Sequence, residues 1–201
     1  TQKQAEKYFK NIPEAIENTE KIADRCNLEI SIGKWFLPKY VVPSGLSYDD
    51  ELRRITEEGI ERRKLEKTPA LLERMNYELK VISDKGYSPY FLVVSDLLHY
   101  AHDHGILTTI RGSVAGSLVT YLANITNVNP IEYLLPFERF LNPDRPSAPD
   151  IDMDYADNRR DEMIAYAKSK YGEDKVAQIG TFGTMMAKGS VKDVARALGY
   201  P

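Results

Sequence analysis

The sequence predicts an α+β protein, in which a helical first half precedes a small mixed β-sheet with helices packed against it. Up to Gly105, cap residues, apolar residues at helical spacing and glycine stops follow one another, which indicates consecutive helices. After Gly105, short β-rich segments alternate with helical ones in the order β-α-β-α-β. One of these segments, "APDIDMDYAD" from Ala148 to Asp157, alternates acidic and apolar residues, so as a strand it would carry its carboxylates on one face.

Four helices are predicted in the first half, at about 13–27, 47–65, 68–86 and 88–105. Pro13 suits the first turn of the first helix. Ser47 or Asp49 is the expected cap of the second helix, and Thr68 is the expected cap of the third. Gly86 would end the third helix, and the fourth is the most apolar and therefore expected to be the most buried.

The second half is predicted to alternate between strands and helices. Strands are expected at 106–110, at the acidic segment and at 175–182, where the sequence reads "KVAQIGTF". Helices are expected at 114–125, 157–172 and 184–199. The turn "RGS" separates the first of these strands from the first of these helices.

The composition is that of an ordinary globular protein of 201 residues. Lys and Arg number 27 against 30 Asp and Glu, so no global basic field indicates a nucleic-acid partner, although basic residues can cluster locally. The single cysteine, Cys26, excludes an intramolecular disulfide and fits a reducing, cytoplasmic location. No apolar stretch is long enough to cross a membrane, so no membrane partner is expected. The sequence starts without Met and stops at "ALGYP", so we expect a piece of a longer polypeptide.

The acidic segment is the first candidate for chemistry. Asp150, Asp152 and Asp154 stand at every second position, and like charges so close together repel one another unless a cation lies among them. Mg²⁺ takes oxygen ligands, and carboxylates on one face of a strand can bridge two such ions for nucleotidyl transfer. The alternative is a solvated sheet face, since acidic residues usually lie in water.

The turn "RGS" is the second candidate. Gly112 and Ser113 would leave main-chain amides open at the start of a helix, which suits a triphosphate, and Arg111 adds a guanidinium beside them. Arg139 is a further candidate, because phosphoryl transfer depends on positive charge aimed at the phosphates. The alternatives are an ordinary helix cap for the turn and a surface ion pair with Glu138 for Arg139. Together, the acidic strand and the turn form the minimal set for a nucleotidyltransferase.

Three longer segments carry a family resemblance. "PYFLVVSDLLHYAHDHGI", "RGSVAGSLVTYLANITNVNPIEYLLPFERFLNPDRPSAPDIDMDY" and "NRRDEMIAYAKSKYGEDKVAQIGTFGTMMAKGSVKDVARALG" resemble, in this order, the palm of the C-family replicative DNA polymerases of bacteria, the DNA polymerase III alpha subunits. The resemblance covers about residues 13–201 and is most specific from Tyr87 onward. It implies a palm of the polymerase-beta nucleotidyltransferase type, and template-directed nucleotidyl transfer from dNTP to a primer 3′-hydroxyl by a two-metal mechanism.

For the acidic strand, the resemblance implies that Asp150 and Asp152 are the catalytic aspartates and the ligands of two Mg²⁺ ions. Asp154 extends the acidic run but is not one of the usual catalytic carboxylates. The third catalytic aspartate of the family lies well downstream, past Pro201. We therefore expect residues 1–201 alone to be inactive and to bind Mg²⁺ weakly.

For the phosphates, the resemblance implies that Gly112 and Ser113 form the triphosphate turn, with Arg139 and Arg111 as phosphate-contacting arginines. The family usually carries a Gly-Pro-Gly-type run before the Gly-Ser pair, whereas this sequence reads "TTIRGS". The bulkier residues at these positions would change how the turn sits.

The resemblance also divides the chain and names its partners. Residues 1–46 would be the exit of a preceding phosphoesterase-like domain with a connector, 47–180 the first part of the palm, and 181–201 the end of the palm and the start of the thumb. The last helix would contact the DNA backbone through Lys188, Lys192 and Arg196. The implied partners are primer–template DNA, dNTP, and the clamp and clamp loader through regions outside this chain.

Two other functions use the same residues. One is a template-independent nucleotidyltransferase, against which the length of the resemblance argues. The other is a module that binds DNA or a partner without catalysis. Two further patterns are expected to be structural: the run His99, His102 and His104 at the polar end of a helix rather than a metal site, and the charges of "ERRKLEK" on a solvated helix face.

Overall fold

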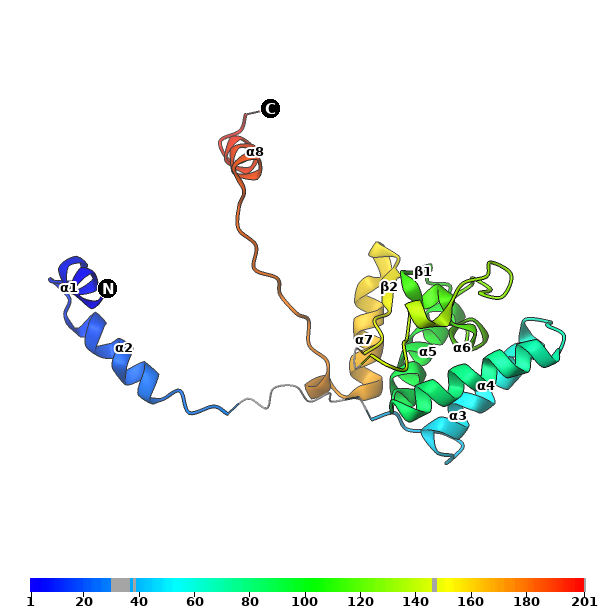
Figure 1. Cartoon of the computed structure of the whole chain (residues 1–201). Coiled ribbons are helices and arrows are strands. Elements are labelled where there is room, and N and C mark those ends of the chain that lie inside the picture. Colours follow the sequence, from blue (N-terminus) through cyan, green and yellow to red (C-terminus); the bar gives the residue numbers. More distant parts are fainter. Residues whose placement is uncertain (30–36, 38, 146–147, 201) are drawn as a thin grey trace. The chain divides into compact units, whose positions relative to one another are not determined.

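The computed structural model of the chain describes residues 1–29, 37, 39–145 and 148–200. The chain divides into two compact units, Thr1–Phe36 and Leu37–Pro201. The first unit contains α1 (Gln2–Tyr8), which the sequence pattern did not reveal, and α2 (Glu14–Asp24), which it predicted (Figure 1). Neither helix has a buried residue. The assignment of 1–46 to a preceding domain and connector, and of 181–201 to a thumb, stays a prediction.

The second unit opens with three helices where the sequence predicts them, α3 (Tyr48–Arg62), α4 (Pro69–Asp84) and α5 (Ser88–Asp103). Two predicted caps are formed. The N–H of Asp50 donates to Ser47 Oγ at 3.1 Å, and the N–H of Leu71 donates to Thr68 Oγ1 at 3.3 Å. Gly86 follows α4 with φ +71°, a left-handed conformation that ends the helix and that glycine adopts most easily.

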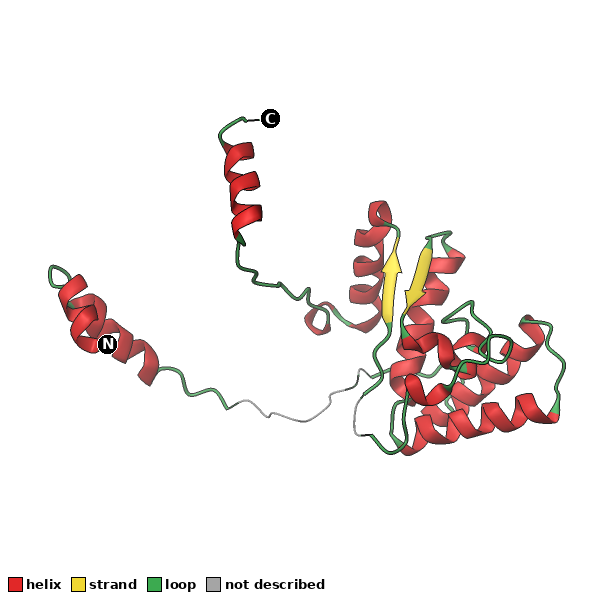
Figure 2. Cartoon of the chain, turned by 45° about the horizontal axis from the view of Figure 1, so that its top comes forward, coloured by secondary structure: helices red, strands yellow, loops and turns green. Residues whose placement is uncertain are grey.

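The sheet consists of two antiparallel strands, β1 (Thr108–Arg111) and β2 (Asp152–Tyr155), which Figure 2 shows as two arrows of opposite direction. The register pairs Thr108 with Tyr155 and Arg111 with Asp152. The mixture of helices with a small sheet confirms the predicted combination of elements. Within the described residues, however, the sheet is purely antiparallel and not mixed.

The strand predicted at 175–182 is not formed. The chain from 176 to 186 carries no regular secondary structure, although Val176 and Ile179 line a shallow groove beside β2. A strand is stable through hydrogen bonds and side-chain contacts with a neighbouring strand. The β-type composition of this segment is therefore not sufficient without a strand to pair with.

The helix predicted at 114–125 is divided into a 3₁₀ turn, η1 (Ser113–Gly116), and a short α-helix, α6 (Leu118–Leu122). Ser117 between them is extended, with φ −101° and ψ 124°, and its hydroxyl caps α6. Gly116 has no room for a side chain, because a Cβ would lie 2.7 Å from the carbonyl oxygen of Pro136. Pro136 precedes another 3₁₀ turn, η2 (Phe137–Arg139), so this close approach holds η1 against η2 and interrupts the helix.

The two helices predicted after the acidic strand are formed as α7 (Arg160–Tyr171) and α8 (Ala187–Ala197). Short 3₁₀ turns precede and follow α7, η3 (Asp157–Arg159) and η4 (Glu173–Lys175). In the part of the chain that the structure describes, no helix combines the length and the apolar character needed to cross a membrane.

The main core lies among α3, α4, α5, α6 and one face of the sheet. Its fully buried side chains include Leu52, Ile82, Phe91, Leu118 and Phe137. Three sheet residues pack against it, namely Ile110, Met153 and Tyr155. Because side chains alternate along a strand, the other face of the sheet carries Thr109, Arg111, Asp152 and Asp154 away from this core.

The charged segment "ERRKLEK" is largely solvated, as the sequence suggests, with only Arg63 of its charged residues half-buried, but its two arginines also contact α6. Arg62 and Arg63 at the end of α3 donate to main-chain carbonyls of α6, among them Tyr121 O, which lies 3.2 Å from Arg63 Nε. Gly59 permits this contact between the helices, because a Cβ there would overlap the carbonyl oxygen of Leu122. Both arginines therefore help to fix α6, which continues from the predicted phosphate turn.

Candidate active site

The acidic residues reach solvent from β2 and from the residues just before it. β2 begins at Asp152, so Asp150 precedes the strand, and both residues are exposed. Ile151 between them is only 7% exposed and belongs to the main core. Met153 and Tyr155 continue this inward row. The apolar residues thus anchor the backbone while the carboxylates stay accessible.

Asp154 differs from the other two acids because an arginine neutralises it. Arg111 Nε and Nη2 donate to the two carboxylate oxygens of Asp154, with Nη2 and Oδ1 3.1 Å apart. The guanidinium holds the pKa of Asp154 below its ordinary value of 3.8. Among the described residues, no hydrogen bond or ion pair engages the side chain of Asp150 or Asp152. Two accessible carboxylates therefore lie beside a neutralised one.

The Gly112–Ser113 turn lies at the end of the sheet where the acidic strand begins. Gly112 directly follows Arg111, whose strand partner is Asp152, so the turn and the acidic pair meet there. Gly112 has φ +93° and ψ −160°, a conformation essentially restricted to glycine, and no atom would lie within 4 Å of an added Cβ. Ser113 is exposed. The main chain is therefore open to an approaching ligand at this point.

The predicted α-helix behind this turn is replaced by one 3₁₀ turn. An α-helix of several turns concentrates partial positive charge at its N-terminus, and a single turn aligns too few peptide dipoles for the same effect. Anion binding here would therefore depend on single amides, the Ser113 hydroxyl and nearby guanidinium groups.

Arg139 lies on η2, which packs against η1 at the close approach of Gly116 to Pro136. Its side chain is exposed, and among the described residues no hydrogen bond or ion pair engages it. The alternative ion pair with Glu138 is not formed; Glu138 Oε1 accepts a hydrogen bond from the Tyr77 hydroxyl at 2.9 Å. An uncommitted guanidinium therefore lies on the element beside the turn.

A family model described as the bacterial DNA polymerase III alpha NTPase domain matches residues 50–201. The chain belongs to the bacterial DNA polymerase III alpha family. The DNA polymerase III subunit alpha of Halalkalibacterium halodurans is 50% identical over 198 residues, which are 98% of this chain and 18% of that protein. The subunit of Bacillus subtilis is 47% identical over 192 residues, 95% of this chain and 17% of that protein. The subunit of Neisseria meningitidis serogroup B is 45% identical over 204 aligned positions, 96% of this chain and 18% of that protein. The chain thus spans less than a fifth of the length of these relatives.

This member of the polymerase III alpha family contains two oxygen-rich side chains suited to Mg²⁺, Asp150 and Asp152. A pair of carboxylates is the usual protein share of a Mg²⁺ site, in which water and phosphate oxygens complete the shell. Within the described residues, no group of three or more His, Cys, Asp or Glu side chains is arranged to hold a metal. The donor set therefore fits Mg²⁺ shared with a phosphate ligand better than a closed metal site.

The histidine run has separate local partners. His99 Nδ1 lies 2.8 Å from the carbonyl oxygen of Ser95, and His104 Nδ1 lies 2.8 Å from that of Tyr100. His102 Nε2 lies 3.1 Å from Thr108 Oγ1 at the start of β1. Burial lowers the pKa of His102, so the neutral ring is favoured at this position.

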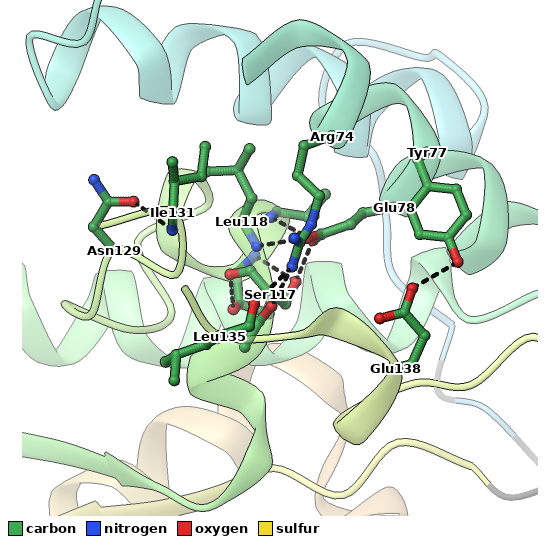
Figure 3. Close-up of polar contacts among 12 residues, drawn as sticks. Arg74, Tyr77, Glu78, Ser117, Leu118, Asn129, Ile131, Leu135 and Glu138 are labelled. Atoms are coloured by element: carbon green, nitrogen blue, oxygen red, sulfur yellow. Dashed lines mark hydrogen bonds and ion pairs between the residues drawn. The ribbon is translucent and has the colours of Figure 1, made fainter. Parts of the chain in front are cut away.

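Two groups of residues near the site were not expected from the sequence. Tyr90 on α5 is one: burial raises the pKa of its hydroxyl, and the nearby charges of Asp150 and Asp152 raise it further. The other is Arg74 and Glu78 on α4, whose contacts to the η1–α6 segment are drawn in Figure 3. A sequence signal for Glu78 existed, since it falls on the apolar stripe of α4 where a charge needs a partner.

The predicted DNA contacts lie on α8. Lys188, Lys192 and Arg196 are spaced four residues apart, so they share one side of the helix. All three are exposed, and Arg196 Nη1 lies 3.4 Å from Asp193 Oδ1. A neighbouring side of the helix exposes Val191, Val194 and Leu198.

Proposed function

We propose that this chain is the palm segment of a longer replicative DNA polymerase subunit, with a palm of the polymerase-beta nucleotidyltransferase type. The subunit would transfer nucleotides from dNTP to a primer 3′-hydroxyl under the direction of a template. The observation that carries the proposal is the meeting of two uncommitted carboxylates, Asp150 and Asp152, with the Gly112–Ser113 turn at one end of the sheet. The family to which the chain belongs supports it.

In this proposal Asp150 and Asp152 hold Mg²⁺. The metal supplies charge stabilisation for the attacking and leaving oxygens of the transfer. The remaining carboxylate of the site would come from a part of the subunit outside residues 1–201. Because Ile151 is buried between the two aspartates, their backbone is fixed and the carboxylates need little reorganisation to reach a ligand.

The triphosphate would lie against the open main chain at Gly112, with the Ser113 hydroxyl as a donor. Arg139 would add positive charge from η2, where its side chain has no competing ion pair among the described residues. Arg111 would contribute only after exchanging the carboxylate of Asp154 for phosphate oxygens. Arg139 is therefore the principal phosphate-binding arginine of the proposal.

The proposal includes the wider partners of the subunit. Primer–template DNA would be held in part by Lys188, Lys192 and Arg196, since lysine and arginine contacts to phosphates do not depend on base sequence. The clamp and clamp loader would bind other parts of the subunit. The proposed location of this enzyme is the cytoplasm.

A primer-extension assay tests the proposal in the full-length subunit that carries this sequence. Asp150→Ala and Asp152→Ala should each abolish extension, because each removes a metal ligand, while the affinity for a primer–template duplex should stay close to that of the unaltered subunit. Extension at the unaltered rate in either variant would refute the assignment of these aspartates. Incorporation that does not follow the template would instead favour a template-independent nucleotidyltransferase.

A further inference from the structure

Three side chains on one face of α4 together contact the η1–α6 segment and η2, the two segments that carry the proposed phosphate-binding groups. Arg74, Tyr77 and Glu78 are spaced i, i+3 and i+4, so they lie side by side on the helix. Figure 3 shows them pointing toward the η1–α6 segment and toward η2. Ser113 begins the first of these segments and Arg139 ends the second.

Glu78 holds the start of α6. Its side chain is fully buried and accepts four hydrogen bonds. The N–H groups of Leu118 and Val119 donate to Oε1 and Oε2 at 3.0 Å each, and the hydroxyl of Ser117 donates to Oε2 at 2.8 Å. Arg74 Nε donates to Oε1 at 2.6 Å. Burial raises the pKa of Glu78, but each oxygen accepts two hydrogen bonds and most of these donors can only donate, so the contacts themselves favour an ionised carboxylate.

Arg74 joins the two segments directly. Its Nη2 donates to the carbonyl oxygen of Gly116 at 2.9 Å and to that of Leu135 at 3.2 Å. Gly116 is the last residue of η1, and Leu135 comes directly before Pro136 at the start of η2. One guanidinium thus connects the carboxylate of Glu78 to the main chain of both segments, which the planar geometry of arginine permits.

Tyr77 fixes η2 at a second point. Its hydroxyl donates to Glu138 Oε1 at 2.9 Å, and its ring meets the buried ring of Phe137 edge-on, with centroids 5.9 Å apart. Glu138 is the neighbour of Arg139. The 3₁₀ turn that carries Arg139 is therefore held against α4.

We infer that Arg74, Tyr77 and Glu78 are positioning residues that set the separation between the Ser113 turn and Arg139. This inference rests on the proposed function, in which these two groups bind one triphosphate. A bound triphosphate spans both groups, so their separation decides how many of its oxygens are met at once. Within the described residues, the three side chains make no hydrogen bond or ion pair to Asp150, to Asp152 or to the sheet face that carries them. They act through the segments they hold.

The test measures the KM for dNTP, kcat, and the fraction of active enzyme in the full-length subunit. Arg74→Lys keeps the charge but loses the fork that bridges Gly116, Leu135 and Glu78, so kcat/KM for dNTP should fall on the order of 10- to 100-fold. Tyr77→Phe keeps the ring against Phe137 and removes only the bond to Glu138, so it should raise the KM for dNTP about threefold. In both variants the fraction of active enzyme should stay unchanged. This fraction is measured as the amplitude of the first turnover.

Tyr133→Phe is the matched control. Tyr133 lies in the loop before η2, is 63% exposed, and its hydroxyl makes no hydrogen bond among the described residues. Its variant should match the unaltered subunit in every readout. If Arg74→Lys does not fold, Tyr77→Phe decides alone, because the partly exposed Tyr77 tolerates loss of its hydroxyl.

A double-mutant cycle separates positioning from general stability. In an Arg139→Ala background, Tyr77→Phe should have no further effect on the KM for dNTP, because Tyr77 acts through Arg139. Additive effects, or a loss of active fraction at constant KM, would overturn the inference and leave a structural role.

Arg139→Ala alone distinguishes the inference from the proposed function. If it leaves the KM for dNTP unchanged, the phosphate assignment of the proposed function fails, and the inference fails with it. If it raises that KM while Arg74→Lys and Tyr77→Phe do not, the proposed function stands and the positioning inference is wrong.

Discussion

Asp152 and Asp154 lie two residues apart on one strand, yet among the described residues only Asp154 forms an ion pair with a cation. Arg111 lies opposite Asp152 in the register, but its guanidinium reaches diagonally to Asp154. Diagonal contacts of this kind are within reach of long side chains on adjacent strands. Asp152, which lies beside the Gly112 turn, therefore has no cation as partner among the described residues. Asp154, farther along the strand, is neutralised by Arg111. Single residue types in the sequence do not reveal which of three aspartates is paired.

The two aspartates should respond differently to substitution. Asp154→Asn removes the partner of Arg111 and frees its guanidinium for phosphate, so we expect template-directed extension to persist, with a KM for dNTP that is unchanged or lower. Solvent screens an exposed ion pair of this kind, so stability should change little. Steady-state primer extension by the full-length Asp154→Asn variant, beside Asp152→Ala, measures this. Equal loss of extension in both variants would make Asp154 a catalytic carboxylate.

At the scale of elements, the sequence predicted those features that depend on residues close together in the chain. Ser47 and Thr68 cap α3 and α4 because a hydroxyl one residue before a helix satisfies a free N–H whatever the rest of the fold does. The split between η1 and α6 was out of reach, since it follows from the contact of Gly116 with Pro136, 20 residues later in the sequence. The strand expected at 175–182 failed for the same reason, because a strand depends on its partner.

The side of α8 that carries Lys188, Lys192 and Arg196 gives an element-scale prediction about DNA. Replacing Lys188, Lys192 and Arg196 with Gln in the full-length subunit should weaken duplex binding equally for all sequences and flatten its salt dependence. Each lost phosphate contact lowers the slope of log K against log salt by about 0.9. Arg196 should contribute least, because Asp193 already pairs with it. Binding to a fluorescent primer–template at several salt concentrations measures the slope.

A control for α8 is available in α1 and the residues after it. Lys3, Lys7 and Lys10 are exposed, and their replacement with Gln removes the same charge from the subunit. If this variant flattens the salt dependence as much as the α8 variant does, the effect is one of net charge and α8 is not a DNA contact.

At the scale of the whole molecule, the site joins segments that are far apart in the sequence. Asp152 is paired with Arg111 in the strand register, and Arg74 donates hydrogen bonds to the carbonyl oxygens of both Gly116 and Leu135. The acidic alternation and the Gly-Ser turn were readable in the sequence because each is contiguous. The sequence indicated only that Glu78 needs a partner; the contacts that the half-buried Arg74 and the buried Glu78 make to distant segments are seen only in the folded chain.

The last prediction concerns residues 1–201 as an isolated polypeptide, which should bind Mg²⁺ weakly and extend no primer. Two carboxylates leave most of the metal shell to water, so we expect affinity in the millimolar range or below detection by calorimetry. Correct orientation of reactants supplies about 7–11 kcal/mol of a barrier, and about 1.4 kcal/mol corresponds to a factor of ten in rate. The chain spans less than a fifth of the length of its relatives. If half of the orientation term depends on the rest of the subunit, its loss lowers the rate by a factor of roughly several hundred to several thousand. Circular dichroism must first establish that the isolated chain is helical and melts cooperatively. Template-directed extension by such a folded chain, lost in Asp152→Ala, would prove that residues 1–201 contain a complete site.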